Sequence, residues 1–197
     1  MPFADLSRPA PVGLVAEGFS LRPIRSSDAA RDYAAVMESR EDLRLWEQSA
    51  WPEDDFTLQA NRADVVEMEQ RHAARRAFSY TVTDPADTRC LGCVYLFEPG
   101  ASFLAASTVT PLADACWAEV DAVVYFWVRS SCVQSGLEGR LLAALRLWCA
   151  GGWGFTSSVF VVSEPFTRQL ELVRRTDLVP EFEVREPDKP ARFLAFG

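Results

Sequence analysis

The sequence lacks the features that would place it in a membrane or on nucleic acid. No apolar run approaches the roughly 20 residues that a membrane-spanning helix needs. Positive charge is scarce, with 20 Lys and Arg against 28 Asp and Glu and a formal net charge of −8. Nucleic acid and anionic lipid both bind a basic face, so we expect no nucleic acid and no membrane among the partners.

The chain also lacks the marks of secretion. Its first residues show no basic start followed by an apolar core, so we expect no secretory signal. Cysteine is sparse and odd in number, with five in 197 residues. That usage favours free thiols in a reducing compartment. These absences together predict a cytoplasmic protein.

What the sequence does contain is enough apolar material for one core. Apolar residues make up 49% of the chain, with 13 Phe and 6 Trp, a composition typical of globular proteins. A chain of this length fits a single domain. We expect the proline-bearing residues 1–16 to form a loosely ordered N-terminal lead-in and residues 17–197 to form the domain.

Hydrophobic periodicity predicts a mixed α/β domain of about seven strands in the order β-α-α-β-β-β-α-β-α-β-β. The expected strands are 19–24, 78–84, 90–98, 117–129, 157–163, 181–186 and 191–196. The expected helices are 26–39, 57–76 with Thr57 as its cap, the segment from Gly136 to a stop at Gly151 and Gly152, and 165–175. Residues 43–55 and 99–115 are expected to be connections without regular structure.

This order of elements resembles the GNAT superfamily of acyl-CoA-dependent N-acyltransferases over about residues 17–197. The resemblance implies a mixed, mostly antiparallel sheet that splays between its fourth and fifth strands, with acetyl-CoA held in the opening as the acyl donor. It also implies a signature after the fourth strand: Gln or Arg, two residues, Gly, one residue, and a final Gly or Ala. In this signature, backbone N–H groups at a helix N-terminus bind the pyrophosphate.

The segment after the fourth expected strand matches this signature in part. Gly136 matches, while Val133 replaces the polar residue and Glu138 the small one. A first-turn carboxylate stabilises a helix by roughly 0.3–1 kcal/mol, but it repels a pyrophosphate unless it turns away or pairs with an arginine. The segment is either a modified acyl-CoA loop or an ordinary acidic helix start. The cofactor-binding residues that the resemblance implies are Val128, Arg129, Ser130, Gln134, Ser135, Gly136, Leu137, Glu138 and Gly139.

Acyl transfer to an amine needs a general base and a general acid. The resemblance implies a carboxylate on the fourth strand as base and a tyrosine on a later helix as acid. Glu119 and Asp121 share a face with Tyr125 in the expected strand 117–129, so Asp121 is the first candidate base and Glu119 the second. The helix 165–175 has no tyrosine, which leaves Tyr125 as candidate acid. The alternative is that the carboxylates face solvent and the tyrosine packs in the core.

Three residues are candidates for binding the acceptor. Trp46 and Trp51 lie between the first two expected helices, and His72 lies on the apolar stripe of the second. In the GNAT fold this half borders the acceptor, so an aromatic, acidic pocket would suit a small-molecule or peptide amine with an apolar body. The alternative is that the tryptophans anchor a loop and that His72 is a hydrogen-bonded, half-buried side chain.

Cys90 and Cys93 form one C-x-x-C pair inside an expected strand. Positions three apart in a strand point to opposite faces, and Cys116, Cys132 and Cys149 form no second pair for zinc. A redox pair would need a helix N-terminus. We therefore expect packed thiols and no metal.

The leading prediction is an N-acyltransferase that moves an acetyl or other acyl group from acyl-CoA to an amine by direct transfer. The alternative is a catalytically inactive GNAT-fold binding or interaction module, which the altered loop and the absent tyrosine favour. A third reading keeps acyl-CoA but performs other thioester chemistry. A homodimer is compatible with the resemblance.

Overall fold

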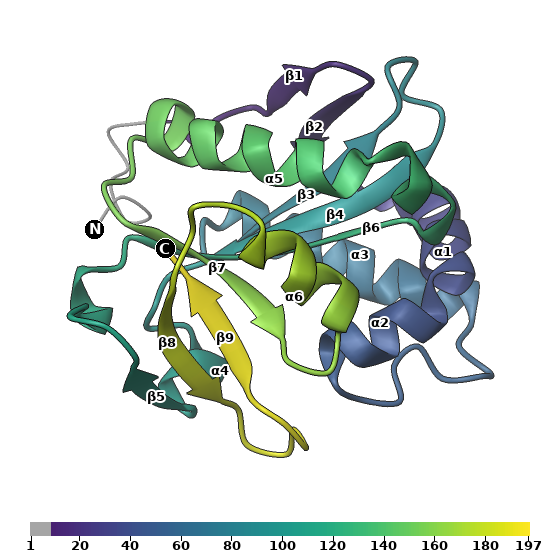
Figure 1. Cartoon of the computed structure of the whole chain (residues 1–197). Helices are drawn as coiled ribbons and strands as arrows, with labels where there is room; N and C mark the ends of the chain where they lie inside the picture. Colours follow the sequence, from purple (N-terminus) through teal and green to yellow (C-terminus); the bar gives the residue numbers. More distant parts are fainter. Residues whose placement is uncertain (1–8) are drawn as a thin grey trace.

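The structure is a computed structural model that describes residues 9–197 and shows a nine-stranded mixed sheet with helices on both faces (Figure 1). The strands follow the spatial order β1-β2-β3-β4-β6-β7-β9-β8-β5. Their bounds are β1 Leu14–Ala16, β2 Phe19–Pro23, β3 Phe78–Thr83, β4 Cys90–Phe97, β5 Thr108–Pro111, β6 Ala122–Val128, β7 Ser158–Ser163, β8 Pro180–Arg185 and β9 Phe193–Phe196. The predicted α/β class and mostly antiparallel sheet are confirmed, with two strands more than expected.

The predicted splay is present between β6 and β7. These two strands are the parallel pair of the sheet, and their register runs only from Ala122 opposite Ser158 to Val124 opposite Phe160. Beyond that point β6 continues against β4 alone, and β7 continues against β9 alone. The two strands therefore separate halfway along their length, and the sheet opens there.

The helices divide between the two faces of the sheet. Their bounds are α1 Ala29–Glu38, α2 Arg40–Glu47, α3 Leu58–Ala73, α4 Ser102–Ala105, α5 Leu137–Trp148 and α6 Thr167–Arg174. Three consecutive residues of β6 pack in three different hydrophobic clusters. Tyr125 packs in the cluster that contains α4, Phe126 in the cluster that contains α5, and Trp127 in the cluster that contains α1, α2 and α3. Thr57 caps α3 as predicted, because its side chain accepts a hydrogen bond from Ala60 N at 3.1 Å.

Three segments that we expected to lack regular structure contain it. Residues 14–16 of the expected lead-in form β1, which pairs with β2, while residues 1–8 lie outside the described part of the chain. The helix α2 covers the start of the expected connection 43–55 and buries Leu43. The expected loop 99–115 holds α4 and β5. Each missed element is short, so it carries too few residues for periodicity to identify it.

The strand expected over 117–129 begins only at Ala122. The residues before it form a single 3-10 turn, Trp117–Glu119. The prediction that Glu119 and Asp121 extend one strand face is therefore wrong, because neither residue belongs to the strand.

The helix α5 does not stop at Gly151 and Gly152 as predicted. A wide helical turn, Cys149–Trp153, continues it. The chain leaves the helix at Gly154, whose φ of 71° is the left-handed conformation that favours glycine at a helix end. Among the described residues, no helix is both long and apolar enough to cross a membrane.

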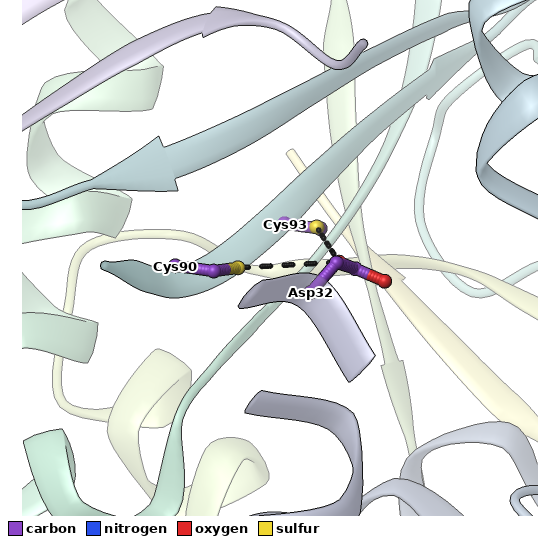
Figure 2. Close-up of side chains that lie close together, drawn as sticks. All are labelled: Asp32, Cys90 and Cys93. Carbon is purple, nitrogen blue, oxygen red and sulfur yellow. Dashed lines mark hydrogen bonds between the residues drawn. The ribbon is translucent and has the colours of Figure 1, made fainter. Parts of the chain in front are cut away.

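Cys90 and Cys93 lie on one face of β4 and not on opposite faces as predicted (Figure 2). Thr83 of β3 pairs with Cys90, whereas its neighbour Val82 pairs with Gly92. One residue of β4 is therefore left over in a β-bulge, which resets the alternation of side chains. The bulge brings both sulfurs to the side covered by α1.

Candidate functional site

The segment that follows β6 is a short 3-10 helix, Ser130–Ser135, which reaches α5 through Gly136. Gly136 has a φ of 72°, a conformation that glycine adopts without strain. The residue that matches the GNAT signature thus turns the chain from the loop into the helix. The side chains of Gln134 and Ser135 are exposed, whereas Leu137 is buried in the core.

The first N–H groups of this segment are already bonded within the chain. Ser131 N donates to Glu38 Oε1 at 3.2 Å, and Ser130 N donates to Ser39 Oγ at 3.0 Å. Arg129 Nε donates to the same Glu38 carboxylate at 2.7 Å. The hydrogen bond from Arg129 is the main reason that the pKa of Glu38 falls to about 2. A charged carboxylate of α1 therefore holds the start of the loop.

In the described chain the N-terminus of α5, unlike the start of the preceding loop, forms no hydrogen bond with a capping side chain. Its leading N–H groups are therefore available to an anion. Glu138 is 5% exposed and accepts hydrogen bonds from Arg168 at 3.2 Å and Gln169 at 3.3 Å, both on α6. Burial raises the pKa of Glu138. Its carboxylate pairs with an arginine of another helix, which is a condition under which a pyrophosphate is tolerated. Gly139, next in the turn, is half-buried.

Side chains from α2 and α6 contact β6 where it has separated from β7. Trp46 Nε1 and Gln169 Nε2 both donate to the carbonyl oxygen of Phe126, at 2.9 and 3.0 Å. Phe126 lies in β6 just before the buried Val128 that ends the strand. Gln169 is completely buried, and within residues 9–197 its Oε1 has no hydrogen-bond partner. A buried acceptor without a donor costs about 1–3 kcal/mol.

A cavity of about 430 Å³ adjoins the opening. Trp46 and Tyr125 line this cavity and also belong to the elements that border the opening. Half of its lining residues are aromatic, namely Trp46, Trp51, Tyr95, Phe97, Phe103, Tyr125 and Phe193. Its charged lining residues are Glu47, Asp64, Glu186 and Arg71. The cavity therefore combines aromatic surface with an excess of negative charge.

The electrostatics of the cavity favour a cationic ligand. Burial raises the pKa of both Glu186 and Asp64, so each carboxylate is incompletely solvated. Tyr125 donates its hydroxyl to Glu186 at 3.4 Å, and burial raises the pKa of this tyrosine. Lys189 pairs with Glu47 at 2.6 Å. The charge of Lys189 partly offsets the effect of burial on the pKa of Glu186, and a positive group on a ligand would further stabilise the ionised forms of Glu186 and Asp64.

Of the three predicted catalytic residues, the structure places Tyr125 at the cavity. Asp121 lies just before β6, where its carboxylate accepts hydrogen bonds from Thr156 N at 2.7 Å and Ser157 N at 3.2 Å. Burial opposes ionisation of Asp121, but these bonds prevail and lower its pKa. Glu119 is exposed. Neither carboxylate lines the cavity, so a role as base stays a prediction for both.

Two of the three residues predicted to bind the acceptor line the cavity, and the third does not. Trp46 and Trp51 line the cavity, and binding of an acceptor stays a prediction for both. His72 does not line it, and its Nδ1 hydrogen-bonds with Ser79 O at 3.0 Å while its ring packs edge-on against aromatic rings of β3. Burial lowers the pKa of His72. The structure thus agrees with the alternative, a half-buried and hydrogen-bonded histidine.

Three residues at the site have no signal in the sequence. Gln169 lies in a helix without a motif, Glu186 follows the last residue of β8, and Glu38 ends α1. Each is distant in sequence from the segments that it serves. Only the folded arrangement identifies them, although the acidic character of the cavity follows in outline from the negative charge of the whole chain.

A sheet that opens between two parallel strands, next to a loop and the N-terminus of a helix, defines the fold of the GNAT acetyltransferases. The chain is similar to the ribosomal-protein-S5-alanine acetyltransferase of Vibrio fischeri, with 17% identity, 94% of each chain covered and a TM-score of 0.65. It is similar to Mycobacterium smegmatis RimJ in complex with CoA-disulfide, with 15% identity, 90% of this chain and 80% of that one covered, and a TM-score of 0.66.

A third similar structure is the Microcin C7 self-immunity acetyltransferase MccE in complex with acetyl-CoA and AMP. Its identity is 12%, the covered shares are 94% of this chain and 95% of that one, and the TM-score is 0.67. No protein-family model and no curated protein sequence matches the chain. At these identities the likeness establishes that the chain has the GNAT fold.

Proposed function

We propose that this protein is an N-acyltransferase that transfers an acetyl or related acyl group directly from acyl-CoA to an amine. The observation that carries the proposal is the buried Gln169 Oε1, an acceptor without a donor at the opening between β6 and β7. Similar structures hold CoA or acetyl-CoA, and the N-terminus of α5 offers uncapped N–H groups nearby. These features support acetyl-CoA as the donor.

The residues of this chain fit the donor in two places. Gln169 Oε1 would accept an amide N–H of the pantetheine arm, and the first turn of α5 would hold the pyrophosphate. Glu138 does not oppose the phosphates, because it is buried and paired with Arg168. When bound, acyl-CoA supplies an acyl group activated as a thioester. The protein has to hold that group and manage the protons.

The cavity would hold the acceptor. Its aromatic wall suits an apolar body and the face of a cation, and Glu186 suits a protonated amine. Several similar structures are acetyltransferases that act on ribosomal proteins, including one that modifies an N-terminal serine. A peptide α-amine is therefore one acceptor to test, next to small cationic amines with an aromatic or aliphatic body.

Two side chains of the cavity suit the proton transfers. Glu186 has a raised pKa because of burial, which makes its carboxylate a better proton acceptor from an ammonium group. Tyr125 has a raised pKa for the same reason, so it stays protonated, and its place in the cavity beside Glu186 makes it the candidate proton donor to a departing thiolate. We assign the base role to Glu186 ahead of Asp121 and Glu119, because only Glu186 lines the cavity.

Thiol release from acetyl-CoA in the presence of an amine panel tests the proposal. We expect release that depends on a cationic amine, with turnover at least about tenfold lower in Glu186→Gln and Tyr125→Phe. Glu171→Gln is the control, since it removes an exposed carboxylate of α6 outside the cavity. Equal turnover in all four proteins would remove both roles, and no release with any amine would reject the activity.

A second function, ligand binding without transfer, is favoured by one observation. The Phe126 carbonyl, which borders the opening, already receives two donors, Trp46 and Gln169. Glu38 likewise accepts a hydrogen bond from the backbone N–H of Ser131 in the loop. If these bonds never open, the cavity can still bind a cation while the donor is excluded. Binding of a cationic amine without any response to CoA would identify this function.

A further inference from the structure

A cluster of three potential metal ligands lies outside the site just described. Figure 2 shows Asp32 of α1 facing Cys90 and Cys93 of β4. Asp32 Oδ1 accepts hydrogen bonds from Cys93 Sγ at 3.4 Å and from Cys90 Sγ at 3.9 Å. One atom from each residue falls within 4.8 Å of the others. The β-bulge of β4 brings the two cysteines to the same side of the strand, and bulges that redirect a side chain are common next to functional sites.

The surroundings of Asp32 give the cluster a reason to bind a cation. Its carboxyl group is buried at 4% exposure, and Asn61 Nδ2 is its amide donor at 2.9 Å. The arginines nearby pair with a different residue, since Arg22 and Arg31 both bind Asp28. Within residues 9–197 no arginine or lysine forms an ion pair with Asp32. Buried carboxylates in proteins are normally paired with a cation, coordinate a metal, or stay protonated.

We propose that Asp32, Cys90 and Cys93 bind one zinc ion through a carboxylate oxygen and two thiolates. Zinc–sulfur and zinc–oxygen bonds of about 2.3 and 2.0 Å at tetrahedral angles separate the two ligand atoms by roughly 3.5 Å. The observed separations of 3.4 and 3.9 Å bracket this value. Thiolates select a soft or borderline metal, which favours zinc over magnesium or calcium.

The neighbouring residues support the site. Thr81 Oγ1 is completely buried and donates a hydrogen bond to Cys90 Sγ at 3.6 Å, so it would orient that ligand from the neighbouring strand β3. Asn61 fixes the orientation of the carboxylate, as a residue next to a metal ligand often does. Both thiols lose a proton on binding. Because the cluster is buried, the metal enters as the chain folds and is retained afterwards.

Metal analysis of the full chain, purified after expression with zinc in the medium, tests the proposal. We expect about one zinc per chain in the wild type and a loss of nearly all zinc in Cys93→Ser and Asp32→Asn. Cys149→Ser is the matched control, because this buried thiol lies outside the cluster, and it should keep its zinc.

A second measurement does not depend on the variants folding. Refolding the wild type with Co²⁺ alone should give thiolate-to-cobalt charge-transfer absorption, with band positions of tetrahedral coordination. Wild-type protein without zinc and without cobalt bands would overturn the proposal. So would equal zinc in the wild type and a folded Cys93→Ser variant, or an intact mass that shows a Cys90–Cys93 disulfide in the purified protein.

Discussion

Glu186 is the residue to which the proposed function assigns recognition of a cationic acceptor. It lines the cavity, accepts the Tyr125 hydroxyl and has a pKa raised by burial. We expect Glu186→Gln to weaken binding of a cationic amine about tenfold or more, because a hydrogen bond to a charged group is worth roughly 1.5–3 kcal/mol. Calorimetric titration against the amine and its neutral isostere measures this. A similar loss for both ligands would show that charge is not the cause.

His72 gives a prediction about pH and stability. Burial lowers its pKa in the folded protein below the ordinary value of 6.5, so the folded state resists protonation. The stability contribution is complete above 6.5 and is lost as the pH falls through 6.5 toward the lower folded pKa. The chain has one histidine, so the effect can be isolated by a single substitution.

The measurement is urea unfolding of the wild type and His72→Phe from about pH 8 to about pH 5. We expect the difference in unfolding free energy between the two proteins to shrink as the pH falls. A difference that stays constant would mean that His72 titrates normally in the folded protein.

At the residue scale, the sequence singles out aromatic residues but not their partners. Trp46 and Trp51 are predicted to bind an acceptor; both line the cavity, and their role in binding stays a prediction. Gln169 and Glu186 were not predicted, because their significance lies in what they face: an orphan acceptor in an opening and a desolvated carboxylate in a cavity. Neither property exists before the chain folds.

The contact between α1 and the loop after β6 is the main feature at the scale of elements. Glu38 accepts hydrogen bonds from Arg129 and Ser131 of that loop. An acyl-CoA pyrophosphate would compete with the Glu38 carboxylate for these donors and would be repelled by its negative charge. We expect Glu38→Gln to raise CoA affinity several-fold, while the free energy of unfolding falls by at most about 1 kcal/mol, the usual range for an exposed ion pair.

Glu67→Gln is the matched control for this contact. It removes the same charge from the pair with Arg71 on α3, at an exposed position far from the loop in sequence. CoA titrations of both variants and the wild type decide the matter. An unchanged CoA affinity in Glu38→Gln would mean that this contact does not restrain the loop.

The bridge from α6 to β6 provides the second prediction for elements. Gln169→Met keeps the side-chain volume nearly constant but removes the Oε1 acceptor and the donor to Phe126 O, which Trp46 still serves. We expect CoA affinity to fall about tenfold, the equivalent of one good hydrogen bond, with the KM for the amine unchanged. CoA affinity equal to that of the wild type would show that Oε1 does not contact the donor.

Most of the elements were predicted from periodicity and turn signals. The predicted strands correspond to β2, β3, β4, β6, β7, β8 and β9 and the predicted helices to α1, α3, α5 and α6, whereas β1, β5, α2 and α4 were missed. The placement of Cys90 and Cys93 was wrong, because a one-residue bulge reverses every face beyond it. Strict alternation cannot foresee such a bulge, although Gly92 between the two cysteines is a residue that bulges favour.

For the whole molecule, the order of elements carried most of the inference. The altered signature around Gly136 was weak by itself, but its position after β6 in a splayed sheet gives it a structural context. The structure shows that the position of the Glu138 carboxylate and the restraint on the loop have different causes. The carboxylate of Glu138 points toward α6, where it accepts a hydrogen bond from Gln169. The loop is instead held by a hydrogen bond to Glu38 of α1, which is distant from Glu138 in the sequence.

Thermal unfolding with increasing acetyl-CoA tests the central claim most directly, because a ligand that binds only the folded state stabilises it by mass action. At about 100 times the Kd, the stabilisation is about 2.7 kcal/mol, which corresponds to a rise in Tm of roughly 5–10 °C for a chain of this size. We expect the Tm to rise in this way and to keep rising with the logarithm of concentration. A Tm that stays constant up to millimolar acetyl-CoA would contradict the acyltransferase account.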